Sequence, residues 1–436
     1  MNIITLTIIL FVALILGLVS GMPIAFALGG IAMVFTIFLW GPEGLFMSVT
    51  ATYSNMSAFV LIAIPMFIFM GFILEKSGVA DALYTTLRLW AGRVNGGLAI
   101  GTVFICTIIA AMVGIIGAGI ITAAIFALPP MLKHGYDKHL AYGAIMAGGC
   151  LGVLIPPSVQ MVVYASIAEQ SVGRMLLGGF FPGLVLSSLY MLYIGIRTAL
   201  NPSLGPGLPP EERVSWPRKL SATKSLILPI AVVGSVLGSI FLGIATPTEA
   251  GAIGCVGVIV CAAVHRRLSW RLLKKAAYDT AKIFGMVFWI LISAACFNQF
   301  YLAMGAASLV KGLLVGLEVN PWIILITMQV ILILLGMIME DLAIMVIAAP
   351  IFTPIVISLG FDPLWFGVIF VINMQIAMLT PPFGFANFYM KGLLPEESMA
   401  EFYRSTYPFV GLQIIGLGLC MAFPNIVLWL PSMIIK

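Results

Sequence analysis

The sequence predicts an all-α membrane protein made of two inverted repeats. Three observations support this: a strongly apolar composition, apolar runs of membrane-spanning length, and one half of the chain resembling the other. Of the 436 residues, 62% are hydrophobic and only 8% are charged, and the mean hydropathy is +1.16. Runs of about 20 apolar residues cross the hydrocarbon core of a bilayer, and a soluble core does not need so many of them. We therefore expect a lipid bilayer as surroundings and no nucleic-acid partner.

Two proline pairs, Pro156-Pro157 and Pro381-Pro382, lie 225 residues apart. The same offset aligns other residues over more than sixty positions: Val94-Asn95 with Val319-Asn320, Thr102 with Thr327, Met112 with Met337, Ala123-Ala124 with Ala348-Ala349, Pro129 with Pro354, Gly135 with Gly360, and Asp137 with Asp362. One offset maintained over such a length indicates an internal duplication. Repeats with helices interrupted at matching places are typical of secondary transporters whose site lies between the repeats.

The apolar runs define the expected elements in order. Membrane spans are expected at 2–20, 23–40, 57–74, 139–168, 175–197, 224–243, 247–264, 283–301, 364–393 and 405–431. The first run has no basic residue and no small-residue cleavage site, so we expect a retained span and not a signal peptide. We expect four segments: scaffold helices and an arm in 1–93, the first repeat in 94–200, a cytoplasmic linker with scaffold helices and arms in 201–318, and the second repeat in 319–436.

Two apolar stretches, 97–131 and 320–358, are too long for one span and have weak centres, Gly114–Gly119 and Gly336–Asp341. We interpret both as re-entrant hairpins that turn within the membrane. Such irregular backbone is tolerated only where it is buried in protein or lines a wet cavity. The proline pairs fall in the next spans, and because proline removes a backbone donor and clashes with the preceding turn, each span is expected to be a broken helix.

The distribution of Lys and Arg predicts the orientation. One side of this topology receives 18 of them: Lys76, Arg88, Arg93, Lys133, Lys138, Arg197, Arg213, Arg218, Lys219, Lys224, Arg266, Arg267, Arg271, Lys274, Lys275, Lys282, Lys391 and Arg404. The other side receives Arg174, Lys311 and Lys436. Cytoplasmic loops are enriched in basic residues, so the first side is cytoplasmic, and the two hairpins enter from opposite sides. The polar stretch 201–221 is then a cytoplasmic linker. The basic segment 265–282 is either an amphipathic surface helix facing anionic lipid or an ordinary solvated loop.

Unwound backbone at membrane depth exposes carbonyls that suit a small cation, whereas helix N-termini suit an anion. We therefore predict one cation site per repeat. The candidate cation-binding residues are Gly114, Gly117, Gly119, Gly152, Pro156 and Ser158 in the first repeat, and Gly336, Asp341, Asn373, Thr380 and Gly384 in the second. An anionic substrate is expected between the sites, near Thr122, Ser158, Gln160, Thr380 and Asn387.

Glu340 and Asp341 are two acids within a long apolar stretch. Ionisable residues at membrane depth are costly and mark functional sites by default. Either Asp341 helps to form the cation site, or the pair lies near water and caps the returning helix.

The remaining polar residues have simpler interpretations. Thr246-Pro247-Thr248-Glu249 is typical of a helix start, the three histidines are expected in solvated cytoplasmic connections, and the six scattered cysteines are expected to pack as small apolar groups. The chain has no GxxxxGK[ST], HExxH or GxSxG motif, which argues against ATP hydrolysis and against an intramembrane protease. We expect no enzymatic activity and no organic cofactor.

Three strings resemble the large membrane subunit of tripartite ATP-independent periplasmic (TRAP) transporters. They are Gly148-Gly149-Cys150-Leu151-Gly152-Val153-Leu154-Ile155-Pro156-Pro157-Ser158, Phe361-Asp362-Pro363-Leu364-Trp365-Phe366-Gly367-Val368, and Asn373-Met374-Gln375-Ile376-Ala377-Met378-Leu379-Thr380-Pro381-Pro382-Phe383-Gly384. The resemblance extends over nearly the whole chain.

The resemblance implies a Na⁺-coupled importer of organic acids, such as dicarboxylates, in the bacterial inner membrane, working by an elevator movement. It implies two partners, a small four-helix membrane subunit and a periplasmic substrate-binding protein. It places Na⁺ ligands at Gly117, Pro156, Ser158, Gly336, Asp341 and Thr380. One difference is that many members have a hydroxyl-rich first hairpin tip, whereas this chain has no Ser or Thr there before Thr122. The first cation site would then rely more on backbone carbonyls.

Two alternatives remain open from the residues. One is a stand-alone anion:sodium symporter that needs no binding protein. The other is a channel or a structural subunit of a membrane complex, against which the paired hairpins and broken helices argue.

Overall fold

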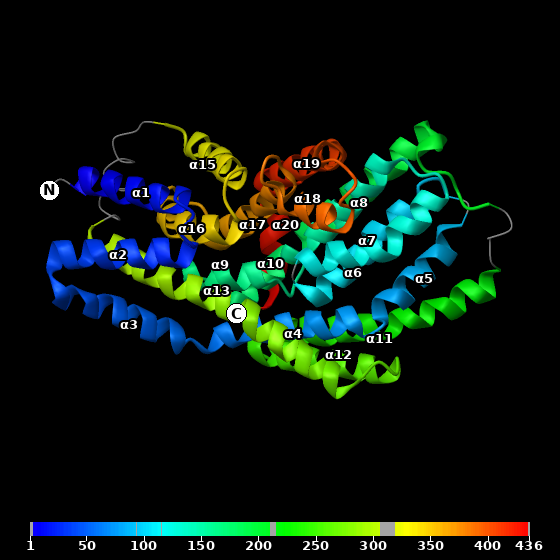
Figure 1. Ribbon diagram of the computed structural model, residues 1–436, viewed down its shortest axis with the longest axis horizontal. Coiled ribbons are helices and arrows are strands. Elements are labelled where there is room, and N and C mark those ends of the chain that lie inside the picture. Colours follow the sequence, from blue (N-terminus) through cyan, green and yellow to red (C-terminus); the bar gives the residue numbers. More distant parts are fainter. Residues whose placement is uncertain (1–2, 93, 115, 210–214, 306–318, 435–436) are drawn as a thin grey trace.

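The computed structural model describes residues 3–92, 94–114, 116–209, 215–305 and 319–434 (Figure 1). These ranges are almost entirely helical and contain no strand. Eight of their helices are long and apolar enough to cross a membrane, and several shorter apolar helices accompany them. The predicted all-α polytopic class is therefore confirmed. Residues 210–214 of the predicted linker, residues 306–318 and Ile115 of the first hairpin tip lie outside the described residues.

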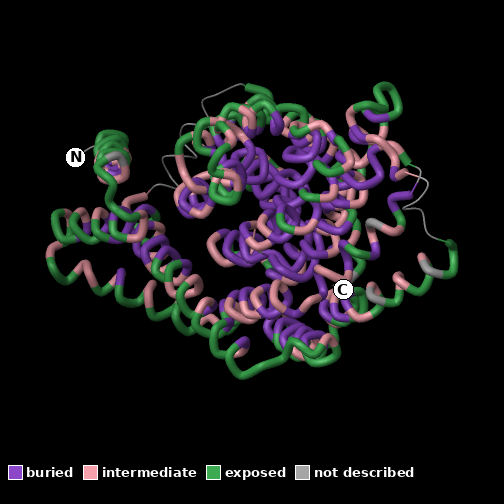
Figure 2. Tube along the Cα trace, turned by 45° about the vertical axis from the view of Figure 1, so that its right-hand side comes forward, coloured by how far each residue is buried: buried purple, intermediate pink, exposed green. Residues whose placement is uncertain are grey.

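Most of the helices outside the two repeats run along the lower side of the molecule in Figure 1, with α1 at the upper left. They are α1 (Ile3–Val19), α2 (Ile24–Trp40), α3 (Leu45–Met56), α4 (Ala63–Lys76), α5 (Val79–Ala91), α11 (Trp216–Phe241), α12 (Pro247–Val264) and α13 (Trp270–Ala303), with 3₁₀ turns η1 (Pro42–Gly44) and η2 (Phe59–Ile62). Helix α13 packs against α2, α3 and α4, while α12 packs against α4 and α11. Helices α1 and α3 lie at the exposed edge of this row (Figure 2). We refer to these helices as the scaffold.

Each repeat contains a hairpin followed by a broken helix, as predicted. The first has α6 (Gly97–Val113), α7 (Ile116–Lys133), α8 (Lys138–Cys150), η3 (Leu151–Val153) and α9 (Val159–Ile167), then α10 (Val172–Leu200) and η4 (Pro202–Leu204). The second has α15 (Pro321–Gly336), α16 (Asp341–Ser358), α17 (Pro363–Leu379) and α18 (Phe385–Leu393), then α19 (Met399–Ala422) and α20 (Asn425–Ile434). The repeats hold most of the buried residues (Figure 2).

Equivalent residues of the two repeats cap a helix and form the turn before it in the same way. Asp137 caps α8 by accepting a hydrogen bond from the Leu140 amide (2.9 Å), and Asp362 caps α17 by accepting one from the Leu364 amide (2.8 Å). Just before these caps, Gly135 and Gly360 have φ angles of 74° and 82°, a left-handed conformation that glycine adopts at little cost. The duplication read from the sequence is therefore a duplication of backbone structure.

The second half of each broken helix packs on the hairpin of the other repeat. Helix α9 contacts α16, and α18 contacts α7. Tyr164 on α9 hydrogen-bonds Thr353 on α16 through their hydroxyls, 3.1 Å apart. Tyr389, which the repeat offset pairs with Tyr164, lies on α18 against Gly117, where an added Cβ would be 3.0 Å from its ring. The repeats are thus interlocked and form one body.

The expected boundaries need three corrections. The basic segment 265–282 is neither a separate surface helix nor a loop, because α13 begins at Trp270, capped by Ser269, and continues without interruption through the span expected at 283–301. The last expected span, 405–431, is two helices that separate at Phe423-Pro424, since proline cannot continue a helix. The span expected at 57–74 begins with the turn η2, and the sequence analysis missed α3 before it.

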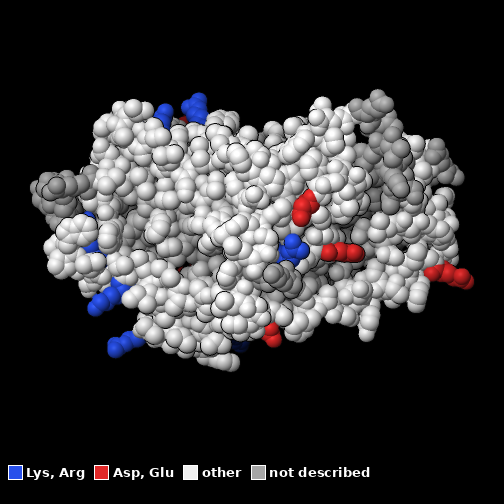
Figure 3. Space-filling view, turned by 180° about the vertical axis from the view of Figure 1, so that it is seen from behind, with Lys and Arg blue, Asp and Glu red and all other residues white. Residues whose placement is uncertain are grey.

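Most of the minor predictions agree with the structure. Thr246 and Glu249 form a reciprocal capping box at the start of α12. All six cysteines are buried and free. The histidines are the exception, because none is simply solvated. The Nδ1 atoms of His134 and His265 lie 2.7 and 2.8 Å from the carbonyl oxygens of Pro130 and Cys261, and His139 Nε2 lies 3.4 Å from a carboxylate oxygen of Glu401. In Figure 3, the basic side chains lie mostly toward the end of the molecule that appears on the right in Figure 1, as the predicted charge asymmetry requires.

The tip of the first hairpin rests on the break in the first broken helix. Gly114 ends α6 with a φ of 62°. A Cβ added to Gly114 would collide with the carbonyl oxygen of Pro157. Both the backbone conformation and the contact therefore require glycine, and they join the hairpin tip to the unwound segment.

We expect Gly114→Ala to destabilise the protein by about 1–3 kcal/mol, because it adds left-handed backbone strain and pushes the tip off Pro157. Thermal unfolding of the purified protein measures this. Gly238→Ala in α11 is the matched control, since its Cβ would meet nothing within 4 Å. Equal unfolding temperatures for the two variants would contradict the predicted role of Gly114.

An ionic cluster joins the repeats at one end. The Lys138 ammonium lies 2.5 Å from Glu397 Oε1, and the Tyr142 hydroxyl donates to the same oxygen at 3.1 Å. Lys391 donates to the Glu397 carbonyl oxygen at 2.7 Å. The hydrogen bond from Lys138 holds the pKa of Glu397 below its usual value. This carboxylate therefore ties the start of α8 to the connection between α18 and α19.

Because the pKa of Glu397 is lowered in the folded protein, its contribution to stability is present above the usual glutamate pKa, about 4.3, and is lost as the pH falls below it. We expect Glu397→Gln to lower the unfolding temperature at pH 7 and to have a smaller effect near pH 3.5. The exposed neighbour Glu396 provides the control Glu396→Gln. A pH-independent difference between Glu397→Gln and the wild type would show that the charge is not the cause.

Candidate functional site

Both hairpin tips and both broken helices meet at one small cavity of about 170 Å³. The two repeats contribute Gly114, Ile116, Gly117, Val153, Val159, Gln160, Glu340, Asp341, Leu342, Phe385 and Tyr389, and the scaffold contributes Ile68, Ile283, Met286 and Val287. Four of the predicted site residues, Gly114, Gly117, Gln160 and Asp341, are therefore brought together. They come from both repeats, so the cavity lies at the repeat interface.

Glu340 and Asp341, at the second hairpin tip, are the only Asp, Glu, Lys, Arg or His residues among those that line the cavity. Asp341 is the first residue of α16 and is only 7% exposed. Glu340 precedes it but makes no capping hydrogen bond with its side chain. The simple capping role for Glu340 is therefore not seen. The cavity wall carries acidic groups at a helix N-terminus and no basic side chain.

The unwound segment of the first repeat uses its hydroxyl internally. Ser158 caps α9, its Oγ accepting from the Met161 amide at 3.2 Å and donating to the Val153 carbonyl. Gln160, on the first turn of α9, lines the cavity, and its Oε1 is buried without a partner among the described residues. Gly119 lies behind the tip, where an added Cβ would be 3.3 Å from the Gly149 carbonyl. Gln160 is thus the polar side chain of this segment that faces the cavity.

Backbone carbonyls gather at the break in the second repeat. The Asn387 amide nitrogen donates to the carbonyls of Leu379 and Gly384, both at 3.2 Å. A Cβ on Gly384, whose φ is 27°, would be 3.0 Å from the Thr380 carbonyl oxygen. The Thr380 hydroxyl donates to the Ile376 carbonyl at 2.6 Å. This oxygen-rich segment has the donor chemistry that a hard cation needs.

Several other predicted residues lie in packing contacts outside the cavity lining. Gly336 packs against Ala377, and Asn373 donates to the Gln329 carbonyl and Oε1, both at 2.9 Å. Asn373 therefore joins α17 to α15 within the second repeat. Thr122 is buried in α7, and Gly152 lies in η3 next to Pro156 and the break. The roles of these residues as cation or substrate ligands stay predictions.

The sequence analysis missed most of the apolar lining of the cavity, and four residues at or near the cavity illustrate why. Tyr389 and Phe385 line it from α18, and Met286 lines it from α13. Gln375, one layer behind, donates from Nε2 to the Cys150 carbonyl at 2.6 Å, and its Oε1 has no described partner. Two of these carried a signal in the sequence, because the repeat offset pairs Tyr389 with Tyr164 and Gln375 with Cys150. Met286 and Phe385 carried none.

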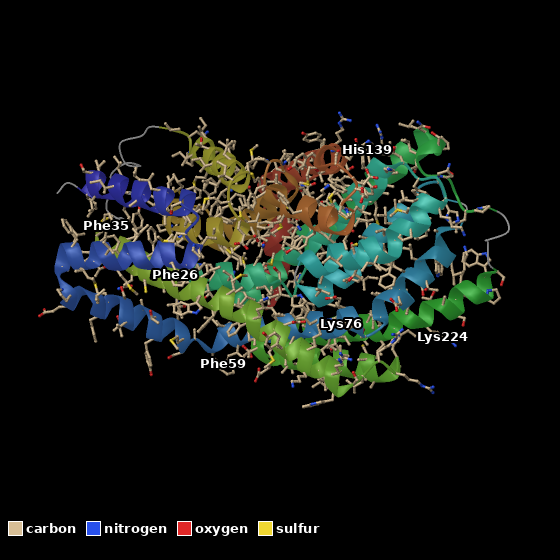
Figure 4. The ribbon with its side chains drawn as sticks, in the orientation of Figure 1. Phe26, Phe35, Phe59, Lys76, His139 and Lys224 are labelled. Atoms are coloured by element: carbon tan, nitrogen blue, oxygen red, sulfur yellow. The ribbon has the colours of Figure 1, made fainter. Side chains whose placement is uncertain are left out.

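A larger groove of about 570 Å³ adjoins the cavity and shares Met286, Glu340 and Phe385 with it. Its walls are mainly apolar and come from the turn between α1 and α2, from α13 and from the second hairpin tip. Phe26 on α2 packs near Trp289 on α13, with ring centroids 6.3 Å apart (Figure 4). The cavity therefore adjoins a groove along the boundary between the scaffold and the second repeat.

The chain has close relatives among known proteins. Residues 11–426 match the family described as the DctM component of the tripartite ATP-independent periplasmic transporter. The chain is 31% identical to the C4-dicarboxylate TRAP transporter large permease protein DctM of Vibrio cholerae, covering 98% of this chain and 97% of the relative. It is 30% identical to the isethionate TRAP transporter permease protein DctMQ of Oleidesulfovibrio alaskensis, covering 94% of this chain and 64% of the relative.

Two solved structures share the fold. The YdaH transporter of Alcanivorax borkumensis has a TM-score of 0.65 at 18% identity, over 92% of this chain and 97% of that one. MtrF of Neisseria gonorrhoeae has a TM-score of 0.58 at 15% identity, over 90% and 85%. The fold and the sequence relatives agree. The chain belongs to the DctM family and is a large permease subunit of a TRAP transporter, a multi-pass membrane protein and not an enzyme.

Proposed function

We propose that this subunit imports an organic anion, a carboxylate, across the bacterial inner membrane by sodium-coupled transport. The observation that carries the proposal is the cavity where the two hairpin tips meet. Glu340 and Asp341 of the second tip form part of its wall. A carboxylate substrate next to these acids would be repelled, because like charges at close range in a low-dielectric site interact strongly. A bound cation removes this repulsion, so substrate and Na⁺ enter favourably only together.

The proposed cation positions follow from the two breaks. In the first repeat, ligands would come mainly from backbone carbonyls around Gly114, Gly117 and Ser158. In the second, they would come from Asp341 and from the carbonyls near Thr380 and Gly384. Gln160 and Asn387 have buried side-chain oxygens without described partners, so rotation of either amide offers a donor or an acceptor to a substrate.

The interlocked repeats support an elevator movement. Each short half-helix is fixed to the opposite hairpin, so both cation positions belong to one body. The scaffold side of the cavity is apolar, formed by Ile68, Ile283, Met286 and Val287. An apolar wall offers no polar contacts that movement of the body would have to break.

We further propose that the subunit works with a small membrane subunit and a periplasmic binding protein. TRAP large permeases function in such assemblies, and the DctMQ relative is longer than this chain, which covers 64% of it. The names of the relatives include C4-dicarboxylate, isethionate and ectoine transporters. The binding protein would therefore choose the substrate within the class of small organic acids.

Uptake by the reconstituted subunit, together with its small-subunit partner, tests the proposal. We expect uptake of labelled organic acids only when an inward sodium gradient and the cognate binding protein are both present. Uptake with sodium but without the binding protein would instead support a stand-alone anion:sodium symporter. Gradient-independent passage would indicate a channel.

We expect Asp341→Asn to reduce sodium-driven uptake at least about tenfold while leaving expression intact, because losing one charge-assisted ligand costs about 1.5–3 kcal/mol. The sodium concentration for half-maximal uptake should rise. Asp81→Asn is the control, since Asp81 lies on α5 outside the cavity lining, with a side chain that is 46% exposed and 3.9 Å from Arg267. Unchanged transport by Asp341→Asn would remove this residue from the mechanism.

A further inference from the structure

A second hollow, of about 480 Å³, lies between α5, α6 and α11, away from the cavity. Its lining is apolar apart from two threonines, Thr86 and Thr223, and includes Leu87, Ile100, Phe104 and Leu226. Phe104 is 49% exposed, so the hollow opens at the surface of the membrane-embedded part. We call it the α5–α6 groove.

The wall of the α5–α6 groove is held in place by hydrogen bonds between α5 and α11. The Thr86 hydroxyl donates to the Ala222 carbonyl at 3.0 Å, and the Trp90 indole nitrogen donates to the Thr223 hydroxyl at 3.1 Å. On the opposite side, α6 approaches closely because Gly101 has no side chain where Leu87 packs. Specific contacts between α5, α6 and α11 therefore define the groove.

Basic and aromatic side chains lie at one end of the groove. The Lys219 ammonium is 5.8 Å from the centre of the Trp90 ring and 5.5 Å from that of Trp216. Among the described residues, no carboxylate lies within ion-pair distance of Lys219. Lys224, further along α11, is exposed at the same end of the molecule (Figure 4). Tryptophan and lysine together are typical of the membrane–water interface, and the charge asymmetry assigns this end to the cytoplasm.

The length and the lining of the groove suit an acyl chain. From Gly97 to Phe104 the helix rises about 10 Å, most of the half-thickness of a hydrocarbon core about 30 Å thick. The walls are apolar over this length, with Ile100 and Phe104 on α6 and Leu87 on α5. An acyl chain that enters at the basic end therefore has an apolar path toward the centre of the bilayer.

We propose that the α5–α6 groove binds one anionic phospholipid of the cytoplasmic leaflet. One acyl chain lies along Ile100 and Phe104, and the phosphate lies near Lys219. The Lys219 ammonium, which no carboxylate of the described residues pairs, supplies the charge complementarity, and the anionic cytoplasmic leaflet supplies the ligand. The inference does not depend on the transported substrate or on sodium coupling.

Native mass spectrometry of the purified full-length chain, with its small-subunit partner, tests the proposal. After delipidation and addition of phosphatidylglycerol or phosphatidylethanolamine, we expect the wild type to retain one phosphatidylglycerol in preference. Lys219→Gln should lower that preference about fivefold, the contribution of one lysine near the membrane surface. Lys274→Gln, an exposed lysine on α13, is the matched control and should behave as the wild type.

Ile100→Trp fills the groove and should abolish the retained lipid, whereas Ile253→Trp on α12, whose side chain is 39% exposed outside the groove, should not. A phospholipid with a photoreactive acyl chain gives a readout on the unmodified protein, and we expect crosslinks to groove residues such as Ile100 and Met191. Equal retention of the two lipids by the wild type, an unaltered Ile100→Trp variant, or crosslinks confined to other surfaces would overturn the proposal.

Discussion

The structure depends on how the polar backbone is satisfied where two helices are broken inside an apolar protein. Each break frees amides and carbonyls that lipid cannot solvate. A few side chains satisfy some of these groups. Ser158 and Asn387 donate hydrogen bonds to backbone carbonyls of their own segments, and Thr380 donates to the carbonyl of Ile376, one turn earlier. Because a broken helix cannot use all its carbonyls internally, the requirement that shapes the fold also offers oxygen ligands to the proposed cation sites.

The hydrogen bond from Gln375 to the Cys150 carbonyl has a geometric meaning, because the two residues occupy equivalent positions in the repeats. Equivalent positions that touch lie next to the pseudo-twofold axis that relates the repeats. The space there is shared, and two identical long side chains could not both occupy it. In this chain a glutamine on one side reaches the backbone carbonyl of the smaller cysteine on the other. The interlocking of α9 with α16 and of α18 with α7 follows from the same axis.

Much of the fold could be predicted from the sequence because its signals are local or periodic. The proline pairs marked the breaks, the constant offset of 225 residues marked the duplication, and apolar run length marked the hairpins. The errors occurred where no local signal exists: nothing in 265–301 distinguishes one long helix from a surface segment followed by a span. At the cavity, Gly114, Gly117, Gln160 and Asp341 were foreseen from their own chemistry. Met286 and Phe385 were not, because an apolar residue is a site residue only through its position in the assembled protein.

The contact between Gly117 and Tyr389 has a consequence for biosynthesis. The tip of the first hairpin is complete 272 residues before the tyrosine that covers it is translated. At 5–20 residues per second the ribosome needs roughly 14–54 s for that interval. During this time the glycine-rich turn, poor in hydroxyl groups, lies in the bilayer without its final neighbour. Thr353 follows Tyr164 by 189 residues, a delay of roughly 9–38 s at the same rates. Neither repeat can therefore finish its own core, and the last contacts of both form only when the end of the chain arrives.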